Sequence, residues 1–166
     1  MAKTRILIAL NQSESSQQII PSVENLFAPD ANELILYYVT RPPSAAGFGE
    51  PDLAAGYVAL PGDKPVMPTL HPIYESQQRD SIKAHVRAEL LPLTKRLSDA
   101  GYEVMVKVGF SKHPNEAIVR YLHECEADLV AMTTLARVGV TRFFFRNIAD
   151  HVVQNANVPV LLVHPD

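Results

Sequence analysis

Apolar residues in this chain fall into short runs that alternate with longer stretches of helical spacing. The runs lie at 5–10, 34–39, 102–108, 128–132 and 158–163. Most of them are continuous and rich in branched residues, which is typical of strands buried on both faces of a parallel sheet, whereas 102–108 alternates. Strands that alternate with helices predict an α/β protein with one doubly wound sheet of five parallel strands.

Four segments between the runs carry apolar residues on one helical face. They lie at about 15–27, 74–100, 115–127 and 147–155. Ser15 and Gln18 form a capping-box pattern at the start of the first helix, and Asn147 and Asp150 form another at the start of the last. Gly101 is well placed to end the second helix. We therefore expect helices on both faces of the sheet.

The segment at about 41–73 differs from the rest of the chain. It contains seven of the thirteen prolines and four of the seven glycines. So many helix- and strand-breaking residues exclude a long helix or a central strand. Loops of this length are either functional or disordered, which leaves a mobile insertion and an ordered lid or partner contact as alternatives. The prediction is a single domain, 1–166, with a Pro/Gly-rich insertion.

Composition narrows the possible functions. The net charge of −3 gives no basic surface for nucleic acid. The single cysteine, Cys125, excludes an internal disulfide and a cysteine-rich metal site, and the six histidines are too scattered to predict a metal. The apolar run from Ile6 to Leu10 is too short for a signal peptide or a membrane span. We expect a cytoplasmic protein that binds no membrane.

The common catalytic motifs are missing. The chain has no Walker A loop, no Gly-x-Gly-x-x-Gly and no His-Glu-x-x-His, and Ser13 and Ser15 lack a Gly-x-Ser-x-Gly context. No acidic cluster follows the first strand, which disfavours a phospho-acceptor receiver. The loop before the last helix could offer backbone N–H groups to an anion. Arg137, Arg142 and Arg146 near it are either solvated or bind an anion through their side chains.

The last forty residues resemble the universal stress protein family, and the resemblance extends over nearly the whole chain. The family pattern is Gly-x-x-Gly, nine residues, then Gly-Ser or Gly-Thr before a helix and a strand of the type PVLVV. In this chain the early glycines fall on Thr133 and Ala136, and the late pair falls on Arg146-Asn147. The length and context of the motif match, but its glycines are replaced.

The resemblance implies a Rossmann-like sheet of the adenine nucleotide alpha hydrolase type, with strand order 3-2-1-4-5. A ligand in such a sheet binds at the switch point, here between the first and fourth strands. The family's Asp at the end of strand one, which contacts the nucleotide, is Asn11 here, and Val39 stands where the family offers backbone groups to adenine. The positions that match the nucleotide site are Leu10, Asn11, Val39, Met132, Thr133, Ala136, Arg146 and Asn147.

The replaced glycines predict weak or absent ATP binding. Glycine lets a backbone approach phosphates closely, whereas Arg146 would project into the phosphate groove. A redirected Arg146 side chain could instead bind a phosphate. We therefore expect a stress-response binding or signalling protein with no catalysis and no cofactor. The alternative is an ATP- or AMP-binding member that acts as a nucleotide sensor or slow ATPase.

The final strand indicates how the protein assembles. An apolar, uncharged edge strand is an open template for pairing. In the family the last strand pairs with its copy about a two-fold axis, which implies a homodimer here. The interface residues expected from this are Val158, Val160, Leu161, Leu162 and Val163. A separate protein partner is also possible.

Overall fold

The structure is a computed structural model in which residues 2–43, 72–134 and 142–165 are described. Five strands form one sheet, and every neighbouring pair is parallel. They are β1 (Thr4–Leu10), β2 (Asn32–Thr40), β3 (Glu103–Phe110), β4 (Leu129–Thr133) and β5 (Val160–Val163). The order β3-β2-β1-β4-β5 confirms the predicted doubly wound sheet.

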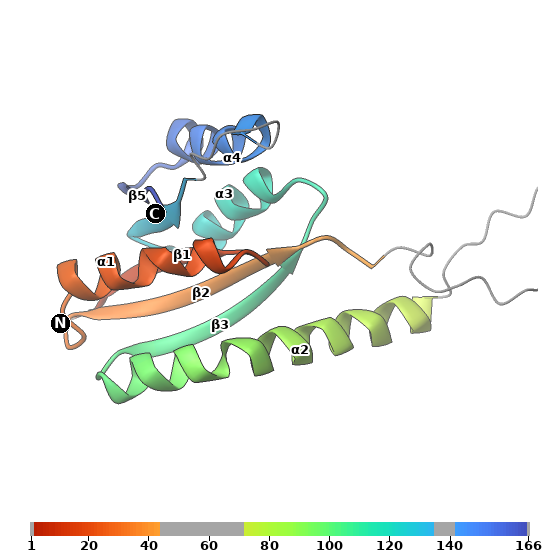
Figure 1. Ribbon diagram of the computed structural model, residues 1–166, viewed down its shortest axis with the longest axis horizontal. Coiled ribbons are helices and arrows are strands. Elements are labelled where there is room, and N and C mark those ends of the chain that lie inside the picture. The colour runs from red at the N-terminus through yellow and green to blue at the C-terminus, as the bar shows by residue number, and fades with distance from the viewer. Residues whose placement is uncertain (1, 44–71, 135–141, 166) are drawn as a thin grey trace, which may run out of the picture.

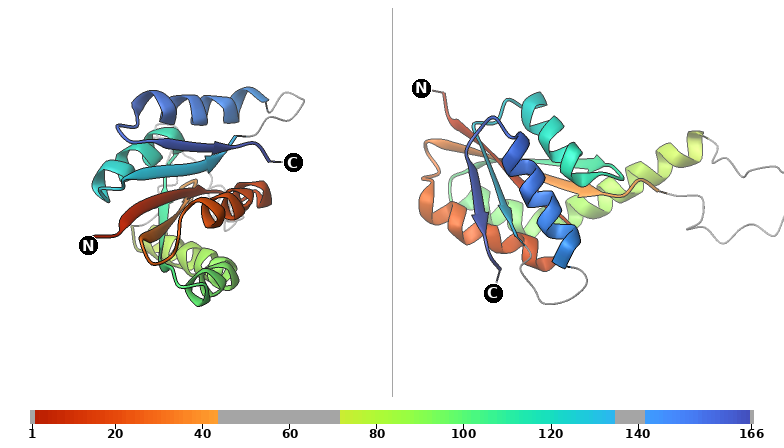
Figure 2. Two further views of the ribbon diagram at one scale, coloured as in Figure 1. Left: turned by 90° about the vertical axis from the view of Figure 1, so that its left-hand side faces the viewer. Right: turned by 90° about the horizontal axis from the view of Figure 1, so that it is seen from above.

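Helices cover both faces of this sheet. They are the short 3-10 helix η1 (Glu14–Gln18), α1 (Ile19–Leu26), α2 (Pro72–Asp99), α3 (Pro114–Glu124) and α4 (Arg142–Asn155). Figure 1 shows α3 and α4 on one face and α2 on the other, where α1 also packs. The first turns of α2 project past the carboxyl ends of β2 and β3, as both Figure 1 and the right-hand view of Figure 2 show.

Strand β1 shows why the apolar runs are continuous. Successive side chains of a strand point to opposite faces. Ile6, Ile8 and Leu10 therefore join a core with α1 and α2, whereas Leu7 and Ala9 join a second core with α3 and α4. All five side chains are buried. A strand in the middle of a sheet covered on both faces needs apolar residues at every position.

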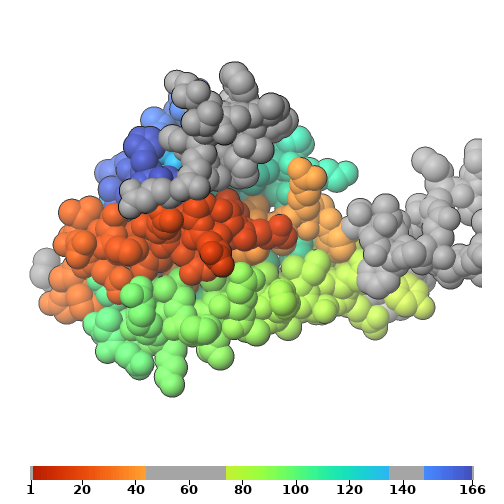
Figure 3. Space-filling view, in the orientation of Figure 1, coloured from red at the N-terminus to blue at the C-terminus, as the bar shows by residue number. Residues whose placement is uncertain are grey.

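Helices α1 and α2 cover the same face of the sheet, and they adjoin in Figure 3, where α1 is red-orange and α2 is green. Arg96 of α2 forms an ion pair with Glu24 of α1 at 3.0 Å. Gly101, with a φ of +99°, follows the end of α2 and confirms the predicted glycine terminus. The next residue, Tyr102, donates its backbone N–H to the carbonyl of Leu97 at 3.1 Å, which closes the last turn.

Both predicted capping boxes are wrong. The chain leaves β1 through η1, so Ser15 lies inside that helix, and neither η1 nor α1 has a side-chain cap. The last helix begins at Arg142, so Asn147 lies in its second turn and Asp150 is not a capping partner. No glycine or proline separates Arg142 from Asn147, so nothing in the sequence stops the helix from starting earlier.

Most of the predicted insertion at 41–73 lies outside the described residues. The described ends are residues 41–43, which follow β2 and have no regular secondary structure, and the start of α2 at Pro72. None of the described helices is both long and apolar enough to span a membrane.

Candidate functional site

A pocket of about 900 Å³ lies where the carboxyl ends of β1, β2 and β4 meet. It is at the switch point of the sheet, because the chain leaves β1 toward β2 on one side and β4 lies on the other. The pocket is lined by residues that end these strands and by the two loops nearby: Ala9, Leu10, Asn11, Gln12, Ser13, Ser16, Val39, Thr40, Arg41, Ser111, Lys112, His113, Pro114, Asn115, Ile118, Met132, Thr133 and Ile148.

The structure brings five of the eight predicted site residues into this pocket. They are Leu10, Asn11, Val39, Met132 and Thr133. Ala136 lies outside the described residues. The backbone of Arg146-Asn147 belongs to α4, but their side chains also lie outside the description. The role of all eight in binding a ligand stays a prediction.

A closed set of hydrogen bonds shapes the pocket wall after β1. The Oδ1 atom of Asn11 accepts the backbone N–H of Ser13 at 2.7 Å. The hydroxyl of Ser16 donates to the carbonyl of Ser13 at 2.8 Å and accepts the backbone N–H of Asn11 at 3.2 Å. Ser16 is only 3% exposed. Asn11 is therefore held as a turn residue, in the way that Asn side chains mimic a backbone turn.

Positive charge gathers on the opposite wall. Arg41 follows β2, and Lys112 lies in the loop between β3 and α3. The backbone N–H of Ser111 donates to the carbonyl of Thr40 at 2.9 Å, which ties the two strand ends together. The N-terminus of α3 faces the same pocket and adds the partial positive charge of a helix start. This wall suits an anionic group.

Sequence reasoning missed this basic wall. It considered an anion only at the start of the last helix, where residues 135–141 and the side chains of 142–147 lie outside the described residues, so that prediction stays a prediction. The signal that was available is Lys112, which lies two residues before a proline at the first helical position, Pro114.

The ends of β4 and β5 are also tied together beside the pocket. Thr134 follows Thr133 and donates its backbone N–H to the carbonyl of Val163 at 2.9 Å. Its hydroxyl also forms a hydrogen bond with Nδ1 of His164. These bonds fix Thr133 at the pocket edge.

Among the described residues, no group of three His, Cys, Asp or Glu side chains is placed to hold a metal ion. Burial raises the pKa of the Cys125 thiol, which therefore stays protonated rather than becoming a nucleophilic thiolate.

A model of the universal stress protein family matches residues 3–164. The chain belongs to the universal stress protein family. This confirms the resemblance carried by the tail. A universal stress protein from Methanocaldococcus jannaschii is 36% identical over 50 residues, which cover 30% of this chain and 29% of that protein.

Solved universal stress protein structures share the fold over nearly the full chain. One family member from Burkholderia pseudomallei has a TM-score of 0.62 and 19% identity, with 98% of this chain and 96% of that chain covered. A family protein from Arabidopsis thaliana, whose structure has AMP bound, has a TM-score of 0.59 and 14% identity, covering 98% and 92%. At such identities the likeness supports the Rossmann-like fold alone.

Proposed function

We propose that this universal stress protein is a stress-linked binding or signalling protein that performs no catalysis and binds ATP weakly or not at all. The main support for weak ATP binding is the asparagine at position 11. The family has an aspartate there, and the amide has no negative charge to attract hydroxyl or amino donors of a nucleotide. Its Oδ1 atom already accepts the Ser13 N–H at 2.7 Å. The residue therefore keeps the turn and loses part of its binding capacity.

The residues that replace the family's phosphate-binding glycines also favour weak ATP binding. Thr133 stands where the family has its first glycine, and its side chain lines the pocket. In the sequence Ala136 and Arg146 replace the next two glycines. Side chains at these positions keep the loop backbone farther from a phosphate than glycine would.

A second candidate function is supported by the basic wall. The pocket volume of about 900 Å³ lies within the usual size of small-molecule sites. Arg41, Lys112 and the start of α3 supply positive charge that would attract a phosphate. The AMP-bound Arabidopsis relative is compatible with this alternative. The second candidate is therefore an AMP- or ATP-binding member that senses nucleotide or hydrolyses it slowly.

Native mass spectrometry of freshly purified protein separates the two candidates. The main proposal expects the mass of the protein without nucleotide, even when the purification is fast and at low salt. A Lys112→Ala variant serves as the matched control, because it removes one charge from the basic wall. Co-purified AMP or ATP that disappears in Lys112→Ala would contradict the main proposal and support the second candidate.

The proposal includes a homodimer formed through β5. This strand is an edge of the sheet, and Leu162 is 38% exposed. Leu161 and Val163 instead pack partly against the core with α1 and α2. Leu162 is therefore the better residue for testing the interface, because a change at Leu161 would also disturb the core. The proposal also includes a cytoplasmic location, which cell fractionation followed by immunoblotting tests.

A further inference from the structure

The lining of the switch-point pocket is positively charged, although the whole chain carries a net charge of −3. Arg41 and Lys112 line the pocket, and no aspartate or glutamate among the described residues does. Neither cation forms an ion pair with a described residue. The start of α3 adds partial positive charge on the same side. Positive charge that no carboxylate cancels favours an anionic ligand.

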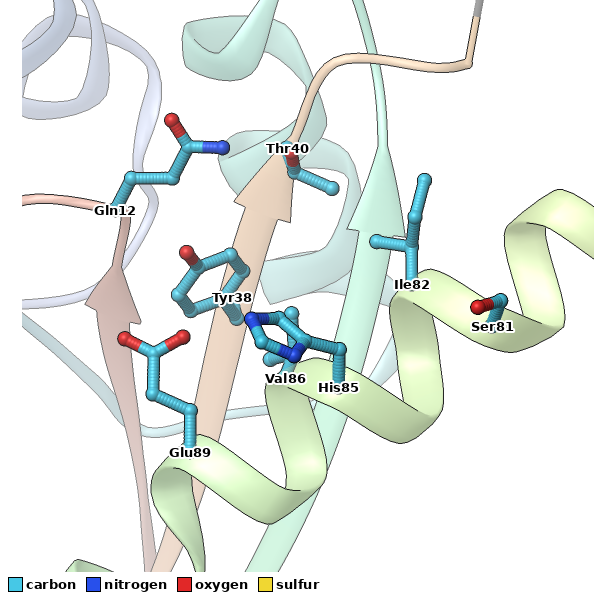
Figure 4. Close-up of a pocket in the computed structure, with 8 residues that line it drawn as sticks. All are labelled: Gln12, Tyr38, Thr40, Ser81, Ile82, His85, Val86 and Glu89. Atoms are coloured by element: carbon cyan, nitrogen blue, oxygen red, sulfur yellow. The ribbon is translucent and has the colours of Figure 1, made fainter. Parts of the chain in front are cut away.

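The groove on the other face of the sheet, between β2 and α2, has the opposite character. Figure 4 shows the Glu89 carboxylate in this groove beside Tyr38, and no lysine or arginine lines it among the described residues. Gln12 and Thr40 border both the groove and the switch-point pocket. An anion that approaches this end of the sheet is therefore favoured on the switch-point side and repelled on the Glu89 side.

The strand register brings the groups of the switch-point pocket to one edge. β1 pairs with β2 as far as Leu10, and β2 pairs with β3 as far as Phe110. Neighbouring strands lie about 4.8 Å apart. The bond from the Ser111 N–H to the Thr40 carbonyl, at 2.9 Å, then holds the two residues that follow, both cations, at adjacent strand ends.

Asn11 decides which hydrogen bond the pocket offers at the end of β1. A backbone N–H can only donate, so the side-chain atom that accepts the Ser13 N–H at 2.7 Å must be the Oδ1 atom of Asn11. The group of the carboxamide that this bond leaves is Nδ2, which only donates. An aspartate at this position would offer a second acceptor oxygen instead. The chain thus has a donor where its family has an acceptor.

Two serine hydroxyls that line the pocket are already engaged as acceptors. The Ser16 hydroxyl accepts the backbone N–H of Asn11 at 3.2 Å and donates to the carbonyl of Ser13 at 2.8 Å. The Ser111 hydroxyl accepts the backbone N–H of His113 at 3.0 Å and donates to the carbonyl of the same residue at 3.1 Å. The hydroxyl and amino groups of a nucleoside therefore meet few acceptors here, whereas an anion meets donors.

We propose that the switch-point pocket binds a small organic dianion without a nucleoside, held by Asn11 Nδ2 and by Arg41 and Lys112. Two carboxylates or one phosphate ester supply the same chemistry, because both present charged acceptors to these donors. This assignment rests on the proposed function, since it names the class of ligand for a pocket whose chemistry has moved away from a nucleotide.

The test is titration calorimetry on the full chain with succinate and with glycerol 3-phosphate. Succinamide and glycerol are the neutral counterparts of these two probes. The wild type should bind at least one dianion saturably, and the dianion that binds tells whether carboxylates or a phosphate carry the charge. Neither neutral compound should bind. A wild type that binds neither dianion would overturn the assignment.

Asn11→Asp is the decisive variant. Its carboxylate can still accept the Ser13 N–H, so the turn stays, but it replaces the donor by a negative charge. It should weaken the dianion about fivefold or more through like-charge repulsion. The same variant is expected to gain affinity for AMP and ATP. Opposite effects on the two classes of ligand are the signature of this assignment, and stronger dianion binding by Asn11→Asp would contradict it.

Lys112→Ala should also weaken the dianion several-fold, because it removes one of the two cations. Lys95→Ala is the matched control, since Lys95 is exposed on α2 outside the pocket, and it should bind like the wild type. Equal binding by the two lysine variants, or of the neutral compounds, would overturn the assignment. Tight ATP binding by the wild type would instead contradict the proposed function, so the two failures are distinguishable.

Discussion

At Asn11 the chain closes the loop after β1 with an amide where its family has a carboxylate. The amide oxygen accepts the backbone N–H of Ser13, and the Ser16 hydroxyl donates to the carbonyl of Ser13. One side-chain change thus preserves the local turn and alters the chemistry presented to a ligand.

Ser16→Ala should lower the free energy of unfolding by about 1–3 kcal/mol, because the buried Ser16 hydroxyl holds both the backbone N–H of Asn11 and the carbonyl of Ser13. Urea denaturation followed by circular dichroism measures this. Ser98→Ala, an exposed serine near the end of α2, is the matched control and should change stability by less than about 0.5 kcal/mol. Equal effects of the two substitutions would mean that Ser16 does not order the loop.

Gly109→Ala should destabilise the fold by about 1–3 kcal/mol through overpacking. A Cβ at Gly109 would lie 2.3 Å from Oη of Tyr37 and 2.8 Å from its Cζ. Tyr37 cannot easily move, because it is 4% exposed and its ring stacks on Tyr121 with centroids 4.3 Å apart.

A double-mutant cycle tests this cause. Tyr37→Phe removes the nearest atom, so Gly109→Ala should cost less in that background than in the wild type. Thermal unfolding of the four proteins gives the coupling. Independent effects would show that the ring is not the obstacle.

Among the elements, the end of α2 is one that the local sequence alone predicts, because a glycine follows it. Gly101 ends α2 with a φ of +99°, and its neighbour Pro29 leaves room for a Cβ at 3.5 Å. Gly101→Ala should therefore cost about 1–2 kcal/mol from backbone strain alone, as measured by chemical denaturation. Gly101→Asn should cost less, because asparagine tolerates positive φ. A larger cost for asparagine would point to a steric cause instead.

The strands were predictable from sequence because burial on both faces makes every position apolar, as in Ile6 to Leu10. The helix starts were not, because Ser15 and Asn147 are good caps that the tertiary structure does not use. Family resemblance located Asn11, Val39 and other residues that the structure brings into one pocket.

The basic wall could not be read from the sequence. Arg41 and Lys112 lie far apart in the chain and meet only because parallel strands bring their carboxyl ends to one edge. Such arrangements depend on packing, which helical or strand periodicity does not encode.

At the scale of the whole molecule, the two edges of the sheet differ. Leu162→Lys should convert the proposed dimer to monomer in sedimentation analysis, because it puts a charge on the β5 edge. Met105→Lys is the control, since Met105 is 58% exposed on β3, the opposite edge, and should leave the assembly unchanged. A dimer that survives Leu162→Lys and separates with Met105→Lys would place the interface on β3.

Weak or absent nucleotide binding is tested most directly by titration calorimetry with ATP and AMP on the wild type, Asn11→Asp and Arg146→Gly. We expect weak or no heat from the wild type. Asn11→Asp should gain affinity by restoring the family's carboxylate, and Arg146→Gly should gain affinity for ATP by opening the phosphate side. Tight ATP binding by the wild type that is lost in Arg146→Gly would contradict the account and make Arg146 a phosphate ligand.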